Sequence, residues 1–170
     1  LVMKKVFSKV LCALLLLASL TAQAQNVTVG LLANMGNDPE VAFKKLHDAG
    51  FKACQTGYNG NWTQKDADRL KELQAKYDIK ISTLVYCTPN SRWNFTEGPS
   101  TIGLVPPMNR LKYLDMHKKA IDFCVMAGIP AFHSHFGFIP EEPTSELYVG
   151  FIQVMKELCL YAKERGVMIF

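Results

Sequence analysis

The order of apolar and polar residues along the chain predicts an alternation of short strands and longer helices. Short apolar runs that stop at polar or glycine-rich turns are typical of strands. Five such runs are expected to be strands, at residues 26–32, 51–55, 79–86, 130–136 ("PAFHSHF") and 167–170 ("VMIF").

Helical periodicity fills the intervals between these runs. Apolar residues recur three and four positions apart in the segments 37–50, 63–78, 110–127 and 145–165. Asp38 before Pro39 is typical of a helix start, and Gly50 and Gly128 are typical of helix ends. The expected buried residues of the third helix are Leu111, Leu114, Ile121, Cys124 and Val125. Those of the fourth are Leu147, Phe151, Val154, Leu158 and Ala162.

Four strand–helix units and the opening strand of a fifth indicate an α/β fold with a parallel sheet and helices outside it. A doubly wound open sheet and a (β/α)8 TIM barrel both have this alternation. No G-x-G-x-x-G or P-loop follows any predicted strand, which removes the usual nucleotide-binding form of the open sheet. A TIM barrel needs about 250 residues. Residues 25–170 are therefore expected to form only the N-terminal half of a barrel.

The first 24 residues have the pattern of a secretory signal peptide. Lys4 and Lys5 precede an apolar run at 10–20, and Ala22 and Ala24 form an A-x-A cleavage site. The run is shorter than the roughly 20 residues of a membrane span. We expect a periplasmic or secreted protein of bacterial type, without a stable membrane anchor.

Loss of this segment changes the charge of the chain. Removing Lys4, Lys5 and Lys9 takes the 19 basic residues to 16, against 15 acidic ones, so the net charge falls from +4 to about +1. A nearly neutral chain lacks the basic surface that nucleic-acid binding needs. Nucleic acid is therefore not expected as a partner.

Four cysteines follow the predicted signal peptide, at wide spacings that match no zinc or C-x-x-C motif. We expect buried free thiols, although a disulfide in an oxidising compartment is also compatible with the spacing. These residues are Cys54, Cys87, Cys124 and Cys159.

Two histidines, His133 and His135, lie in the fourth predicted strand. Alternation places them on one face with Ala131, and places Phe132 and Phe136 on the other. Large apolar side chains pack under helices, so both histidines are expected inside the barrel, with His135 nearer its mouth. We expect His133 to be hydrogen-bonded in the interior and His135 to contact substrate, because TIM-barrel active sites lie at the strand ends.

Other candidates at the mouth also follow predicted strands. The expected substrate-binding residues are Gln55, Tyr58, Cys87 and His135. Asn34, after the first strand, is a further candidate but also suits a turn. His47 and His117 fall on helices and are expected to be surface or packing residues. No Ser-His-Asp or Cys-His pairing is evident from spacing, and no catalytic or metal-binding residue is assigned.

The segment 87–107 is long and contains four prolines, which is typical of a functional loop. Trp93 and Phe95 in it, and Trp62 in an earlier loop, could stack on a sugar ring or pack within their own loops. Glu141 and Glu142 are expected to be a solvated pair in an exposed turn.

Several stretches resemble the sugar phosphate isomerase/epimerase family, the xylose isomerase-like TIM barrels of AP endonuclease family 2. They are "TIGLVPP", "KKAIDFCVMAGIPAFHSHFGFIPEEP" and "ELYVGFIQVMKELCLYAKERGVMIF". The resemblance implies an exported isomerase or epimerase that acts on a small-molecule sugar. It also implies a divalent metal (Mn, Mg, Co or Zn) and carboxylates that transfer a proton between neighbouring carbons.

In the family the first glutamate ligand follows the fifth strand, which "VMIF" only begins. The resemblance thus implies metal ligands beyond Phe170 and an inactive 170-residue chain, with His135 as a pocket residue. Two alternatives stand beside the isomerase. One is an exported carbohydrate-binding barrel without catalysis, and the other is a metal-dependent phosphodiester hydrolase of the endonuclease IV type. The sugar, the metal and the oligomeric state do not follow from the sequence.

Overall fold

The computed structural model describes residues 27–170, and the predicted signal peptide at 1–24 lies outside them. The strands are β1 (Gly30–Ala33), β2 (Ala53–Gly57), β3 (Lys80–Tyr86), β4 (Ala131–Ser134) and β5 (Met168–Ile169). The helices are α2 (Pro39–Asp48), α3 (Gln64–Tyr77), α4 (Gly98–Thr101), α5 (Arg110–Ala127) and α6 (Glu146–Glu164).

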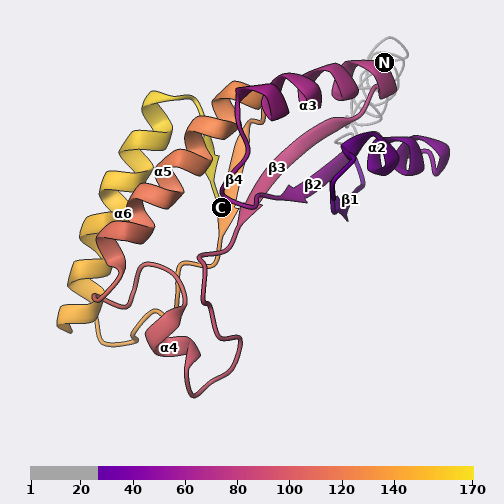
Figure 1. The fold of residues 1–170 in the computed structure, drawn as a ribbon. Helices are drawn as coiled ribbons and strands as arrows, with labels where there is room; N and C mark the ends of the chain where they lie inside the picture. Colours follow the sequence, from indigo (N-terminus) through magenta and orange to yellow (C-terminus); the bar gives the residue numbers. More distant parts are fainter. Residues whose placement is uncertain (1–26) are drawn as a thin grey trace, which may run out of the picture.

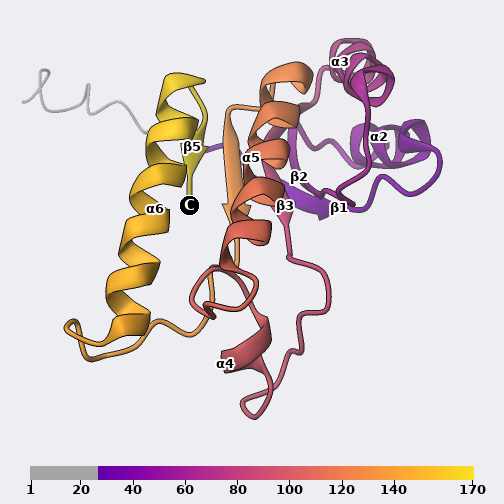
Figure 2. The ribbon, with the colours of Figure 1, turned by 60° about the vertical axis from the view of Figure 1, so that its left-hand side comes forward.

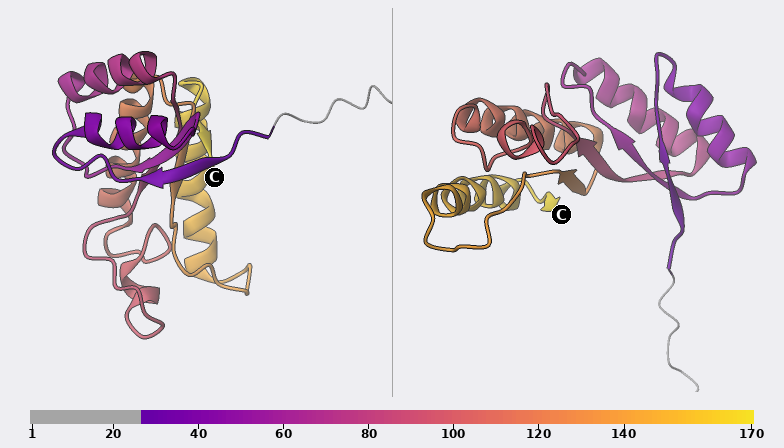
Figure 3. Two further views of the ribbon diagram at one scale, coloured as in Figure 1. Left: turned by 90° about the vertical axis from the view of Figure 1, so that its right-hand side faces the viewer. Right: turned by 90° about the horizontal axis from the view of Figure 1, so that it is seen from below.

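The strands form one parallel sheet in the order β1-β2-β3-β4-β5 (Figure 1). A doubly wound sheet reverses its strand order at a switch point, whereas a barrel adds each strand beside the previous one. Helices α2, α3, α5 and α6 cover the convex face of the curved sheet, and the concave face is open (Figures 2 and 3). The fold is therefore part of a TIM barrel, as the sequence predicts.

Strand register assigns each side chain to one of the two faces, because paired residues point the same way. Leu84 pairs with Phe132 and Tyr86 with Ser134, and all four are buried beneath the helices. Residues on the concave face include three register pairs: Leu32 with Gln55, Gln55 with Thr83, and Val85 with His133.

Local signals explain where the helices begin and end. Asp38 accepts a hydrogen bond from the Glu40 amide at 3.0 Å and so caps α2. Ser145 caps α6 in the same way, through the Tyr148 amide at 3.3 Å. Gly128, with φ +67°, ends α5. The predicted bounds of α5, 110–127, are confirmed.

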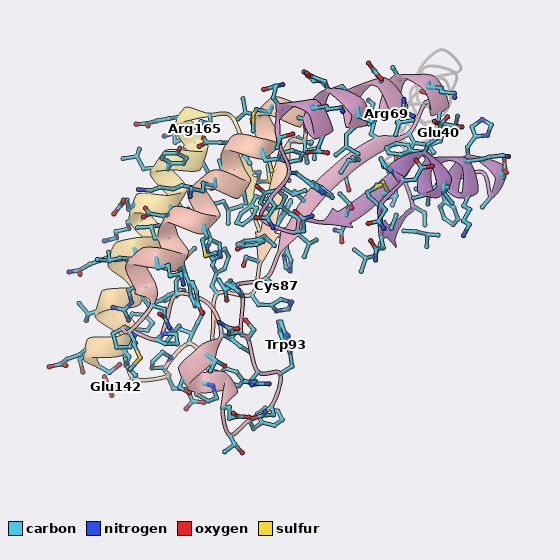
Figure 4. The ribbon with its side chains drawn as sticks, in the orientation of Figure 1. Glu40, Arg69, Cys87, Trp93, Glu142 and Arg165 are labelled. Atoms are coloured by element: carbon cyan, nitrogen blue, oxygen red, sulfur yellow. The ribbon has the colours of Figure 1, made fainter. Side chains whose placement is uncertain are left out.

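Ion pairs join neighbouring helices on the convex face. Glu40 of α2 accepts hydrogen bonds from Arg69, Lys76 and Tyr77 of α3 (Figure 4). The pKa of Glu40 is lowered to about 2, mainly by the hydrogen bond from the Lys76 ammonium and next by the one from the Tyr77 hydroxyl. Between α5 and α6, Asp122 of α5 accepts hydrogen bonds from the Tyr161 hydroxyl and from Arg165 Nε, each at 2.8 Å.

The predicted buried stripe of α5 is partly wrong. Leu111 is 74% exposed and Val125 is 50% exposed, whereas Tyr113, His117 and Phe123 are buried. Each residue advances the helix by about 100°, so Leu111 and Val125, two positions from Tyr113 and Phe123, face away from the sheet. The prediction for Leu147 on α6 is also wrong, because that residue is exposed in the first turn, whereas Phe151, Val154, Leu158 and Ala162 are buried.

Strand bounds also differ from those predicted. β2 covers 53–57 instead of 51–55, because the Phe51 amide donates to the Leu46 carbonyl at 3.0 Å and belongs to the end of α2. β4 ends at Ser134 instead of 136, because the Phe136 carbonyl is bound by the loop before α5. That loop, expected to lack secondary structure, contains α4.

None of the helices within residues 27–170 has the length and apolarity to cross a membrane. Cys54, Cys87, Cys124 and Cys159 are all free, as expected, but the prediction that they are buried is wrong for Cys87 and Cys159, which are exposed. Burial raises the pKa of Cys54 to about 11, so this thiol is protonated at neutral pH.

The conspicuous "TIGLVPP" segment binds the loop before α5 to the loop that follows β4. The Leu104 and Val105 amides donate to the Phe136 carbonyl at 2.8 and 3.2 Å. Gly103 has φ +69°, and a Cβ there would lie 2.2 Å from the Phe136 carbonyl carbon. Glycine is therefore needed at position 103 for both conformation and space. Arg110 reinforces the loop by donating from Nε to the Leu104 carbonyl at 2.8 Å.

We predict that Gly103→Ala lowers the free energy of unfolding by about 3 kcal/mol or more, since it adds a backbone clash to the cost of a positive φ. Gly128→Ala is the matched control. Its φ is +67°, but a Cβ there meets nothing within 4 Å, so its cost is about 1–2 kcal/mol. Urea unfolding monitored by circular dichroism measures both, and equal losses would contradict the role of the loop contact.

Candidate functional site

The carboxyl ends of β3 and β4 bring the candidate residues of two loops together. Tyr86 pairs with Ser134, so the next residues, Cys87 and His135, leave neighbouring strands at the same level. Cys87 and Trp93 lie at this end of the sheet, on the segment that leads to α4 (Figure 4). This is the edge at which TIM barrels carry their active sites.

His135 and Trp93 form the centre of this site. Their ring centroids are 4.7 Å apart with the planes at 80°, an edge-to-face contact. The His133 ring is a further 5.5 Å from that of His135, also edge to face. Register places His133 on the concave face, opposite Val85, as expected.

A cavity of about 490 Å³ opens beside this pair. Its walls come from both loops and are mostly aromatic or aliphatic: Trp93, Phe95, Ile102, Phe136, Phe138 and Ile139. His135, Asn94 and Ser134 are the polar residues of the lining. A concave, mostly apolar cavity with a few polar groups is the usual form of a small-molecule site.

Two predicted sugar contacts lie apart from this cavity. Gln55 faces the concave side but pairs with Thr83, four residues before Cys87, and so lies roughly 13 Å deeper along the strands. The Tyr58 ring is on the convex side, stacked on Phe123 at 5.1 Å. Burial raises the pKa of Tyr58. The structure therefore brings together His135 and Cys87, but not Gln55 or Tyr58.

The Cys87 thiol lies at the mouth but is not activated. Although part of the residue is exposed, the protein around the thiol removes water and raises its pKa. A nucleophilic cysteine needs a lowered pKa. Cys87 is also not among the residues that line the cavity, although it lies at the same edge of the sheet as His135.

The remaining candidates have structural roles. The Asn34 side chain accepts a hydrogen bond from the Gly36 amide at 2.9 Å, which makes a turn. Trp62 packs on Phe123 at 5.3 Å instead of facing the mouth. Glu141 and Glu142 are exposed, as expected.

A buried pair beneath the mouth is not evident from residue spacing. His117 is fully buried, and its Nε2 lies 2.9 Å from the Ser134 hydroxyl. Its Nδ1 lies 2.6 Å from the Tyr113 carbonyl, which only accepts hydrogen bonds, so Nδ1 carries the proton and Nε2 accepts from Ser134. Burial lowers the pKa of His117 and keeps the ring neutral. The alternation in β4, which turns Ser134 toward the helices, is the signal that could have found this pair.

Within residues 27–170, no cluster of three or more His, Cys, Asp or Glu side chains is arranged to hold a metal ion. His133 and His135 are adjacent, but catalytic zinc sites use three protein ligands. Residues 27–170 therefore do not by themselves provide a binding site for a divalent metal.

Comparison with known families identifies the barrel. Residues 43–170 match the model of the xylose isomerase-like TIM barrel. The chain belongs to this family.

Solved structures agree with this membership of the xylose isomerase-like family. A xylose isomerase domain protein from Planctomyces limnophilus has a TM-score of 0.73 and 20% identity, over 83% of this chain and 52% of that one. A D-psicose 3-epimerase from Clostridium cellulolyticum, solved with D-tagatose, has a TM-score of 0.62 and 12% identity, over 84% and 51%. A sugar phosphate isomerase/epimerase from Parabacteroides distasonis has a TM-score of 0.52 and 11% identity, over 88% and 52%.

Because these sequence identities are low, the similarity to the solved structures establishes the fold of the chain and not its activity. The chain spans about half the length of each matched protein. No protein with a curated description matches it.

The buried His117–Ser134 pair predicts a dependence of stability on pH. The pKa of His117 is lower in the folded chain than its usual 6.5, so below pH 6.5 the unfolded chain binds a proton that the folded chain does not. The free energy of unfolding should then fall with decreasing pH, by up to about 1.4 kcal/mol per pH unit. Urea unfolding between pH 7.5 and 5.5 measures this slope.

His117→Gln should reduce the slope, because it removes the buried group that only the unfolded chain protonates. Equal slopes in the wild-type chain and His117→Gln would show that another group causes the acid sensitivity.

Proposed function

We propose that this chain supplies the sugar-binding half of the mouth of an isomerase or epimerase. The contact between His135 and Trp93 at the end of β4 carries the proposal, because it places a hydrogen-bonding ring beside an aromatic face. Sugars present hydroxyl groups at their edges and C–H groups on their faces, which match such a pair. Homologous D-psicose 3-epimerases have been solved with D-fructose and with D-tagatose, which supports a small ketose as the ligand.

The full reaction would move a proton between neighbouring carbons of the sugar. General acid–base groups and a divalent metal serve this chemistry in the family. No Asp or Glu is among the residues that line the mouth cavity. We therefore propose that residues 27–170 bind and orient the sugar, and that turnover by the 170-residue chain alone is not measurable.

A second candidate function is carbohydrate binding without catalysis. Two features of the mouth cavity favour carbohydrate binding: its walls are largely aromatic, and no carboxylate lines it. Sugar binding is common to both functions, whereas isomerisation of a ketose distinguishes them. The phosphodiester hydrolase has no supporting observation in the described residues.

We predict that His135→Ala weakens ketose binding about tenfold, because a hydrogen bond and the support of Trp93 are lost together. Isothermal titration with D-fructose, D-tagatose and D-psicose measures the dissociation constant. His47→Ala is the matched control, since His47 is an exposed histidine on α2. Unchanged binding in His135→Ala, or an equal loss in both variants, would refute the assignment of the site to His135.

A further inference from the structure

The outer part of the mouth cavity is more apolar than a sugar requires. Beyond the His135–Trp93 pair, its walls are formed by Phe95 and Phe138, whose rings meet edge to face at 6.1 Å. Phe95 is 91% exposed, and Phe138 is 39% exposed. Exposed aromatic side chains gathered around a concave surface indicate a binding site.

The polar groups of the cavity are mostly engaged within the protein. Asn94 Oδ1 accepts from the Thr96 and Glu97 amides at 3.0 and 2.7 Å, and its Nδ2 donates to the Glu97 carboxylate at 3.1 Å. The Ser134 hydroxyl is bonded to His117. Among the side chains of the cavity wall, only the His135 ring and the Trp93 indole N–H remain available to hydroxyl groups. Outside that pair, the wall therefore offers apolar contact.

The Phe138 side of the aromatic wall is held in place before any ligand binds. The Phe138 ring packs against the backbone of α4, where a Cβ on Gly98 would lie 2.7 Å from it. The adjoining segment is fixed by the Phe136 carbonyl, which accepts from Leu104 and Val105. A ring fixed in this way loses little conformational entropy on binding, whereas the exposed Phe95 ring gains burial.

We propose that this outer cavity binds an apolar ring joined to the sugar, as in an aryl glycoside. The inference rests on the sugar binding of the proposed function, because the sugar itself would lie against His135 and Trp93. A glycoside has no free carbonyl, so it would be bound there without being isomerised. The volume favours a small ring over a protein surface, since a cavity of about 490 Å³ is in the range of small-ligand sites.

The test compares phenyl and methyl glycosides of glucose, galactose and xylose by isothermal titration. The ratio of their dissociation constants isolates the contribution of the ring. We expect the phenyl glycoside of the preferred sugar to bind about tenfold more tightly, from burial of the ring and its edge-to-face contacts. A ratio near one, or no binding of any glycoside, would overturn the inference.

Phe95→Ser should reduce the ratio to about two while leaving the methyl glycoside unaffected. The high exposure of Phe95 makes a loss of folding a poor explanation for this change. Leu111→Ser is the matched control, since it removes another exposed apolar side chain, on α5, outside the cavity. An unchanged ratio in Phe95→Ser overturns the proposal. The proposal is also overturned if the wild-type chain is a dimer without any phenyl preference and Phe95→Ser converts it to a monomer. The cavity would then hold a second copy of the chain.

Failure of this inference is distinguishable from failure of the proposed function. His135→Ala should weaken phenyl and methyl glycosides by the same factor, whereas Phe95→Ser should change only their ratio. Ketose binding that depends on His135, together with a phenyl-to-methyl ratio near one, overturns the aryl site and leaves the sugar site intact.

Discussion

One backbone acceptor, the Phe136 carbonyl, determines the shape of the mouth. It accepts from both Leu104 and Val105, and so ties the long loop after β3 to the loop after β4. A side chain on Gly103 or Gly137 would prevent this approach. Residues far apart in the sequence, Trp93 and His135, meet as a consequence. Without this contact only side-chain packing, such as that of Phe95 on Phe138, would hold the two loops together.

The aromatic residues fall into two groups: buried rings that stabilise the core, and exposed rings that can bind a ligand. Rings such as Tyr58 and Trp62 pack on Phe123 beneath α5, where they are part of the core. Trp93, Phe95 and Phe138 lie in loops beyond the strand ends and remain exposed. Since both groups have the same side-chain chemistry, position relative to the sheet, rather than residue type, decides which rings can contact a ligand.

Periodicity was sufficient to predict the order of the strands and long helices and the bounds of α5, because local spacing and helix caps determine them. It did not distinguish a barrel from a doubly wound sheet, since both have the same alternation. It was insufficient for the rotation of that helix, since Leu111 and Tyr113 are both apolar and only packing against the sheet selects Tyr113. For the site, His135 could be placed from alternation in β4. The positions of Tyr58 and Gln55 depended on where β2 ends, and a helix hydrogen bond at Phe51 moved that end by two residues.

The buried polar pair connects the core of the half-barrel to its mouth. His117 holds the Ser134 hydroxyl from α5, and Ser134 is the residue immediately before His135. Because a buried hydroxyl that loses its partner is costly, Ser134 is kept facing the helices. Alternation along the strand then turns His135 toward the opposite, concave side, where Trp93 meets it. The orientation of the ring that would contact a sugar therefore depends on a hydrogen bond that no ligand touches.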